Sequence, residues 1–249
     1  MSGFSPDDDL AFERKARLLA VPVALLLAAL FHASGVGHFL QRTFLTMMVH
    51  EVGHAVTAWT CSFAAMPFLW RTMIAATRGP LTFIVVAGGC VALVVAGVRG
   101  GRRRLVVAGA IFLALHLVGS MIPARSAQAL ITFGGDGGAL VLGTALMASF
   151  FVGPENYLRV NALRWGFLVI GAAAFTDTFA TWWQARHDYD VIPFGEIEGV
   201  GLSDPSKLSD VYGWTVHALV HRYVTLGVVC LLGLAVVWAR GVWQARRTS

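Results

Sequence analysis

Charged side chains are scarce in this chain of 249 residues. Asp, Glu, Lys and Arg make up 13% of it and hydrophobic residues 57%, whereas charged residues make up about a quarter of a soluble domain. A soluble globule of this size cannot bury so much apolar surface and still cover itself with polar groups. The same composition excludes a disordered or collagen-like chain. We therefore expect an integral membrane protein with the lipid bilayer as its surroundings.

Cysteine is also rare, and its placement excludes a disulfide scaffold. The three cysteines, Cys61, Cys90 and Cys230, lie far apart in or beside apolar segments and form no C-x-x-C pair. They are typical of small buried hydrophobic residues. The net charge is +5, but the basic residues form short clusters beside apolar runs. That placement is typical of the ends of membrane helices, so we expect no nucleic-acid partner.

Apolar runs of bilayer length occur about seven times, since a spanning helix needs about 20 mostly apolar residues. The predicted spans are residues 16–31, 38–61, 81–98, 105–122, 137–152, 163–183 and 215–239. We expect residues 1–249 to form a single all-α domain, a polytopic transmembrane helical bundle of about six to eight spans. The expected location is the bacterial cell (inner) membrane, crossed several times.

Two connections between these spans are long. Residues 62–80 are partly apolar, and we expect them to lie in the membrane interface or to re-enter the membrane. Residues 184–213 carry six of the 14 acidic residues, so we expect a solvated acidic loop. Within it, Asp204-Pro205 predicts an N-cap at Asp204 with proline at the first helical position, and a short helix to about Val211.

The motif that carries chemistry is His50-Glu51-Val52-Gly53-His54, an H-E-x-x-H sequence inside the predicted span 38–61. On a helix, positions i and i+4 share a face, so both imidazoles can reach one metal ion. Imidazole suits zinc, which acidifies a bound water, and the carboxylate of Glu51 can take that water's proton. The alternative is a polar contact between helices that holds no metal. Ionisable residues in an apolar span favour the functional interpretation.

A catalytic zinc needs a third protein ligand. The first candidate is Asp136 in Gly134-Gly135-Asp136-Gly137-Gly138, where the glycines allow close backbone approach and the predicted helix 137–152 begins. The alternative interpretation of Asp136 is an ordinary turn between helices. The rival ligand is Asp177, which lies inside the predicted span 163–183 and therefore needs a partner.

Residues 50–55 on an apolar helix, followed later by Asp136-Gly137-Gly138, resemble the site-2 protease or M50-like family of intramembrane zinc metalloproteases. The resemblance implies that His50, His54 and Asp136 bind Zn²⁺ and that Glu51 is the general base. It implies a hydrolase that cleaves peptide bonds in or near a transmembrane segment of a membrane-protein substrate, with metal-bound water as nucleophile. The family's Asn-Pro element is missing from residues 127–132, and we expect a small, divergent member without a PDZ domain.

A second H-x-x-x-H pair, His217 and His221, lies at the start of the predicted span 215–239. It can form a second metal-binding face, or it can lie at the membrane interface beside Trp214 and Tyr223. The pair also resembles the ceramidase-like seven-helix zinc hydrolases. The first alternative to the protease is therefore a zinc-dependent membrane amidase that uses both histidine pairs. A second alternative is a catalytically inactive membrane scaffold.

Three other histidines lie outside these motifs. We expect His116, alone in the predicted span 105–122, to make a polar contact within the protein and to bind no metal. His32 and His38 flank the first loop, and we expect both to be solvated.

Overall fold

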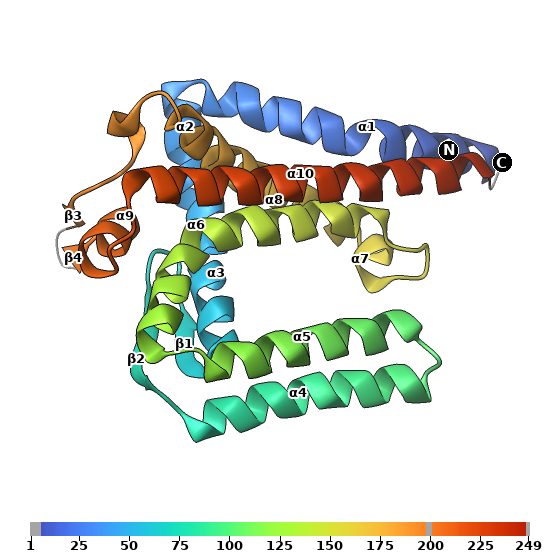
Figure 1. The fold of residues 1–249 in the computed structure, drawn as a ribbon. Coiled ribbons are helices and arrows are strands. Elements are labelled where there is room, and N and C mark those ends of the chain that lie inside the picture. Colours follow the sequence, from blue (N-terminus) through green and yellow to red (C-terminus); the bar gives the residue numbers. More distant parts are fainter. Residues whose placement is uncertain (1–5, 198–200, 248–249) are drawn as a thin grey trace. The chain divides into compact units, whose positions relative to one another are not determined.

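The structure is a computed structural model that describes residues 6–197 and 201–247, and it is 79% helix. Its long helices are α1 (Pro6–His32), α3 (Met47–Thr60), α4 (Pro80–Arg99), α5 (Arg103–Met121), α6 (Ala124–Ala148), α8 (Leu163–Gln184) and α10 (Val216–Arg247) (Figure 1). The shorter helical segments are α2 (Gly35–Leu40), η1 (Gln41–Thr46), η2 (Ser149–Phe151), α7 (Tyr157–Val160), η3 (Tyr189–Val191), α9 (Asp204–Ser206) and η4 (Lys207–Val211). The strands β1 (Phe63–Pro67) and β2 (Thr72–Arg78) form one antiparallel hairpin, and β3 (Glu196–Ile197) and β4 (Gly201–Leu202) form another.

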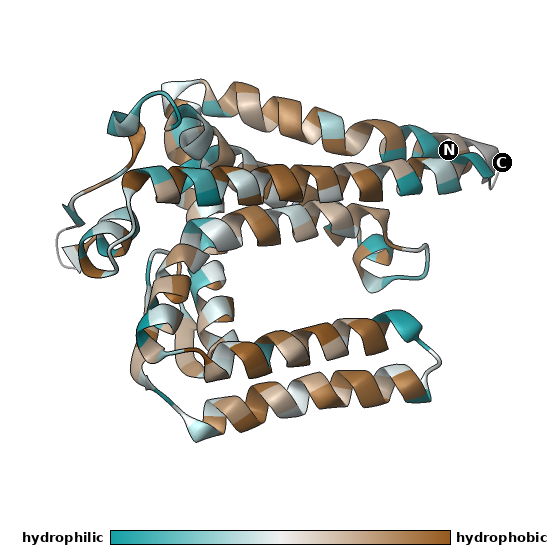
Figure 2. Ribbon diagram, viewed as in Figure 1, coloured by the Kyte–Doolittle hydropathy of each residue, from teal (hydrophilic) through white to brown (hydrophobic). Residues whose placement is uncertain are grey.

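Five helices of the described chain are long and apolar enough to cross a membrane. They cover Leu10–His32, Pro80–Arg99, Arg103–Met121, Ala124–Phe151 and Val216–Arg247. Figure 2 shows apolar residues along most of α4 and α5, with hydrophilic residues where the two helices are joined. These helices are consistent with a multi-pass membrane protein. The predicted spans 38–61 and 163–183 are helical but are not among the five, and each carries the ionisable residues described below.

The helices α4 and α5 pack against each other along their length. A Cβ on Gly109 of α5 would lie 2.8 Å from Val94 Cγ2 of α4, so a small residue there lets the two helices approach closely. Their outer apolar side chains, such as Leu81 and Val118, are exposed. Large exposed apolar surfaces of this kind call for lipid or a protein partner.

The chain divides into two compact units. The first comprises Met1–Val49, Ala139–Pro193 and Thr215–Ser249, and the second comprises His50–Gly138 and Phe194–Trp214. In the first unit α1, α8 and α10 pack together, and the buried ring of Trp182 stacks on Tyr223 with 4.1 Å between ring centroids.

The second unit is held together by close backbone packing and by the β1–β2 hairpin. A Cβ on Gly53 of α3 would lie 2.8 Å from the Cα of Gly138 in α6, so the glycines let these two helices approach to backbone contact. Arg78, at the end of β2, donates hydrogen bonds to the carbonyl oxygens of Cys61 (3.1 Å) and Ile122 (2.6 Å). Residues 62–80, predicted to lie in the interface or re-enter the membrane, therefore form a hairpin anchored beside α3 and α5.

Two local predictions differ from the structure. The helix that contains Asp136 begins at Ala124, so Asp136 lies in the middle of α6 and does not open a helix. The N-cap of α9 is Ser203, whose Oγ accepts a hydrogen bond from the backbone of Ser206, and it is not Asp204. Because a hydroxyl performs the capping, the carboxylate of Asp204 is available for other contacts.

Candidate metal centre

The imidazoles of His50 and His54 meet on one face of α3, as the helical spacing predicts. Their Nε2 atoms are 3.1 Å apart, and each residue is 7% exposed. The rings lie edge to face, with 4.7 Å between their centroids. Residues one helical turn apart on a single face have therefore brought two ring nitrogens to one point inside the second unit.

The opposite nitrogen of each ring has its own hydrogen-bond partner. His50 Nδ1 lies 2.9 Å from Asp136 Oδ1, and His54 Nδ1 lies 2.7 Å from the carbonyl oxygen of Ile131. Both partners are acceptors, so each ring carries a proton on Nδ1 when its Nε2 binds a metal. Each Nε2 then presents a lone pair, the form in which a histidine binds metal, with a carboxylate or carbonyl fixing the ring from behind.

Asp204 faces both of these lone pairs. Its Oδ2 atom is 3.2 Å from His50 Nε2 and 2.9 Å from His54 Nε2. The carboxylate comes from α9, in the segment predicted to be a solvated acidic loop, yet its side chain is only 21% exposed. That prediction is wrong for Asp204, because the segment folds back onto α3 within the second unit.

Asp204 is a charged carboxylate at neutral pH. Burial alone would raise the pKa of Asp204, but hydrogen bonds and positive charge from His50 and His54, when these rings are protonated at Nε2, hold that pKa well below its usual range. Two imidazole lone pairs and a carboxylate oxygen that meet at one point repel one another unless a cation lies among them. A proton on a ring or a metal ion can supply that charge.

The donor set fits zinc. Zinc holds imidazole nitrogens at about 2.0–2.1 Å and carboxylate oxygens at about 2.0–2.2 Å, so neighbouring ligand atoms of a tetrahedral ion lie about 3.3 Å apart. The distances among the His50, His54 and Asp204 ligand atoms are 3.1, 3.2 and 2.9 Å. One ion fits among these three atoms, and two nitrogens with one oxygen are a usual set for catalytic zinc.

Asp136, the ligand predicted from the sequence, lies at the same centre but on the far side of the His50 ring. Its Oδ1 contacts Nδ1, whereas Asp204 lies beside Nε2. This geometry favours Asp204 as the third ligand and Asp136 as the residue that orients His50. A metal ligand at Asp136 stays a prediction that depends on the family resemblance.

Glu51, the predicted general base, is buried and held by the β1–β2 hairpin. Thr72 Oγ1 lies 2.7 Å from Glu51 Oε2 and 2.8 Å from the Glu51 carbonyl oxygen. The residue is 4% exposed. Thr72, like Asp204, carries no signal in the sequence that would assign it to the centre, because a threonine that begins a strand is unremarkable.

The glycines around Asp136 leave room for the rings of α3. A Cβ on Gly135 would lie 2.6 Å from His50 Nε2 and 2.5 Å from His54 Nε2, the two nitrogens that face Asp204. Within the second unit, a side chain at this position would collide with the centre itself. The sequence prediction of close backbone approach at this glycine run therefore agrees with the contacts.

The other histidines and Asp177 lie outside this centre. His116 is buried, with its ring nitrogens 3.1 and 3.2 Å from the carbonyl oxygens of Thr60 and Phe83, which agrees with the predicted polar contact. The rings of His217 and His221 are stacked and exposed. Within the described residues, they belong to neither of the two groups that could hold a metal. Asp177 belongs to the second of these groups, described below.

Comparison of the chain with protein-family models, with curated proteins and with solved structures finds no match. The geometry of the centre and the motif around His50 therefore remain the only indications of function.

Proposed function

We propose that the chain is a multi-pass integral membrane zinc metalloprotease of the site-2 protease or M50-like type. It hydrolyses peptide bonds in or near transmembrane segments of membrane-protein substrates. The observation that carries this proposal is the convergence of His50 Nε2, His54 Nε2 and Asp204 Oδ2, with Glu51 adjoining the first ligand in the chain.

The proposed roles follow from these contacts. His50, His54 and Asp204 would hold the zinc, while Asp136 and the Ile131 carbonyl fix the two rings. When bound, zinc would supply an acidified water as nucleophile and polarise the scissile carbonyl. Glu51 would act as the general base toward the attacking water and as the proton donor to the leaving amine. Thr72 holds the Glu51 carboxylate in one orientation.

The membrane setting is part of the proposal. We propose about seven spans, in which residues 38–61 and 163–183 join the five apolar helices; the location is the bacterial inner membrane. A span that carries His50, Glu51 and His54 is costly in lipid unless those residues face the protein interior, and all three are buried. Their burial is what a catalytic helix surrounded by other helices requires.

The decisive variant is Glu51→Gln, tested by co-expression with candidate single-span substrates. We expect loss of cleavage with zinc content unchanged, because glutamine keeps the side-chain shape but cannot take a proton. Glu155→Gln, at an exposed position outside the centre, is the matched control and should cleave like the wild type. If Glu51→Gln cleaves as well as the control, the enzyme assignment is lost and the inactive scaffold is favoured.

The amidase alternative requires His217 and His221 in the zinc centre. We expect His217→Ala to keep both zinc and peptide cleavage, because the exposed ring lies outside the ligand group of His50, His54 and Asp204. Loss of zinc in His217→Ala, together with its retention in Asp204→Asn, would favour the amidase.

A further inference from the structure

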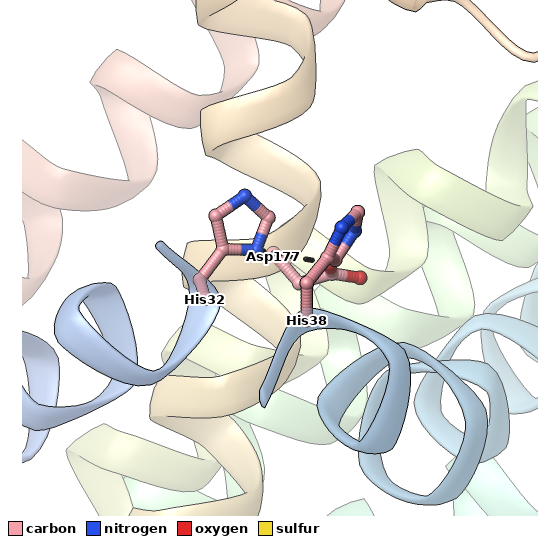
Figure 3. A group of neighbouring side chains, drawn as sticks. All are labelled: His32, His38 and Asp177. Atoms are coloured by element: carbon pink, nitrogen blue, oxygen red, sulfur yellow. Dashed lines mark ion pairs between the residues drawn. The ribbon is translucent and has the colours of Figure 1, made fainter. Parts of the chain in front are cut away.

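A second group of histidines and a carboxylate lies in the first unit. His32 is the last residue of α1, His38 lies in α2, and Asp177 lies within α8. Figure 3 shows the two imidazoles on either side of the Asp177 carboxylate, carried by three separate segments. The sequence predicts His32 and His38 to be solvated; in the structure His32 is largely buried, with 20% of its side chain exposed, and both rings face Asp177.

Both histidines approach the same carboxylate oxygen. Asp177 Oδ1 lies 3.3 Å from His32 Nδ1 and 3.2 Å from His38 Nε2, and the ring centroids are 4.4 Å apart. The two distances from Asp177 Oδ1 match the distance of about 3.3 Å between ligand atoms of a tetrahedral zinc. The three side chains therefore present one ligand atom each to a common point.

Two of the three atoms at that point are buried without a hydrogen-bond partner. His32 Nδ1 and Asp177 Oδ1 are both buried without a hydrogen-bond partner, although they are only 3.3 Å apart. Asp177 is fully buried, and an unsatisfied buried carboxylate oxygen is costly. A metal ion among the three ligand atoms would coordinate the lone pairs of both His32 Nδ1 and Asp177 Oδ1. Coordination by a metal needs no proton between these two atoms.

The rest of the cluster leaves this point available. Arg42 Nη1 contacts the other oxygen of Asp177, Oδ2, at 3.3 Å, so the carboxylate is oriented with Oδ1 toward the histidines. His38 is half-exposed, with 48% of its side chain accessible, which gives an ion a path to the cluster. Gln41 Oε1 and Thr178 Oγ1, on the same elements as Arg42 and Asp177, are further buried oxygens without partners.

We propose that His32 Nδ1, His38 Nε2 and Asp177 Oδ1 bind a second divalent transition-metal ion, with zinc favoured by the two imidazoles and one carboxylate. This site is separate in its residues from the proposed catalytic centre and does not depend on the catalytic role of that centre. An ion there would tie the end of α1 and the helix α2 to α8. Metal binding would therefore add to the stability of the first unit.

The first test counts zinc in the purified full-length chain, stripped with a chelator and reloaded with Zn²⁺ alone. We expect about two zinc ions per chain in the wild type and about one in Asp177→Asn or His38→Ala. His187→Ala, which removes an exposed histidine elsewhere in the first unit, should keep both. The variant Asp204→Asn should keep only the ion bound by His32, His38 and Asp177, and adding His38→Ala should remove that ion as well. The single and double variants therefore report on the two sites separately.

A second test identifies the ligand directly and does not depend on the count. In His38→Cys loaded with Co²⁺, a thiolate ligand should produce a near-ultraviolet charge-transfer band that the wild type lacks. Because His38 is half-exposed, this variant should fold, which circular dichroism and gel filtration check. An unchanged spectrum, or equal zinc content in wild type, Asp177→Asn and His38→Ala, would overturn the proposal and leave an ion pair between Asp177 and protonated histidines.

Discussion

The His50 cluster and the His32 cluster offer the same ligand types, two imidazoles and one aspartate, in different electrostatic surroundings. At the first, Asp204 is joined by the carboxylate of Asp136 behind His50. At the second, the Asp177 carboxylate faces the guanidinium of Arg42. Ligand type alone therefore does not rank the two sites, and charge does. The first has two carboxylates against the Lys207 ammonium, 4.0 Å from Asp204 Oδ1, whereas the second has one carboxylate against the Arg42 guanidinium.

The two clusters also differ in how their rings are held. Both Nδ1 atoms of the first cluster have acceptor partners, which fix the tautomer and aim each Nε2. At the second, His32 uses Nδ1 and His38 uses Nε2, and His38 is half-exposed. A preorganised set of ligands loses less entropy on binding, so we expect the first cluster to bind zinc more tightly.

The largest expected effect comes from Asp204→Asn. Removing this charge from between the two Nε2 atoms should weaken zinc binding at the first cluster by more than about 100-fold, since loss of an orienting partner alone costs about 10- to 100-fold. Peptide cleavage should disappear with it. Zinc titration by competition with a chromophoric chelator measures both sites; an affinity at the first cluster within tenfold of wild type would contradict Asp204 as a ligand.

Gly135→Ala comes next. The added methyl would meet the Nε2 atoms of His50 and His54, and displacement of such a group by about 1 Å can cost about 100-fold in activity. The second cluster should keep its zinc. Gly88→Ala is the matched control, because a Cβ there meets nothing within 4 Å. Equal cleavage by the two variants would show that the centre is more open than the contacts imply.

The variant Asp136→Asn tests whether Asp136 orients His50 or binds the metal itself. If Asp136 only orients His50, zinc affinity at the first cluster should fall by about 10- to 100-fold, less than in Asp204→Asn. The same titration ranks the two variants. A reversed order, with Asp136→Asn the more damaging, would restore the ligand assignment implied by the family resemblance.

The smallest expected effect is an increase in zinc affinity at the second cluster. Arg42→Gln removes the positive charge beside Asp177 and should tighten zinc binding at the second cluster by up to about tenfold, a modest amount because the guanidinium is 31% exposed and partly screened. The first cluster should be unchanged. Arg14→Gln, at an exposed position on α1, is the control. A weaker second site in Arg42→Gln would mean that Arg42 positions Asp177 more than it repels the ion.

The sequence predicts the parts of the site that depend on local spacing. Residues 47–60 form a helix, His50 and His54 share a face, and the glycine run around Asp136 lies against α3. Helical periodicity and the small size of glycine act over a few residues, so they can be read without the fold. Of the seven spans that the apolar runs predict, five correspond to helices of the described chain that are long and apolar enough to cross a membrane.

The predictions that fail concern contacts between distant segments. Asp204 is predicted as a solvated N-cap because it precedes proline in an acidic segment; Ser203 performs the capping and Asp204 turns to the histidines. His32, at the end of α1, is predicted to be solvated but is largely buried, whereas His38 in α2 is exposed as predicted. Nothing local indicates that α8 brings Asp177 to them. The sequence shows that Asp177, an ionisable residue in an apolar run, needs a partner, but it does not show which residue that partner is.

Hydropathy and helical period are local properties, so the sequence alone predicts apolar helices of membrane length and a pair of histidines on one helix face. Which carboxylate meets which histidines is visible only in the fold, since it depends on how α9 returns to α3 and how α1, α2 and α8 pack. Within the described chain, Asp177 and Asp204 thus have histidine partners that neither motif nor spacing reveals.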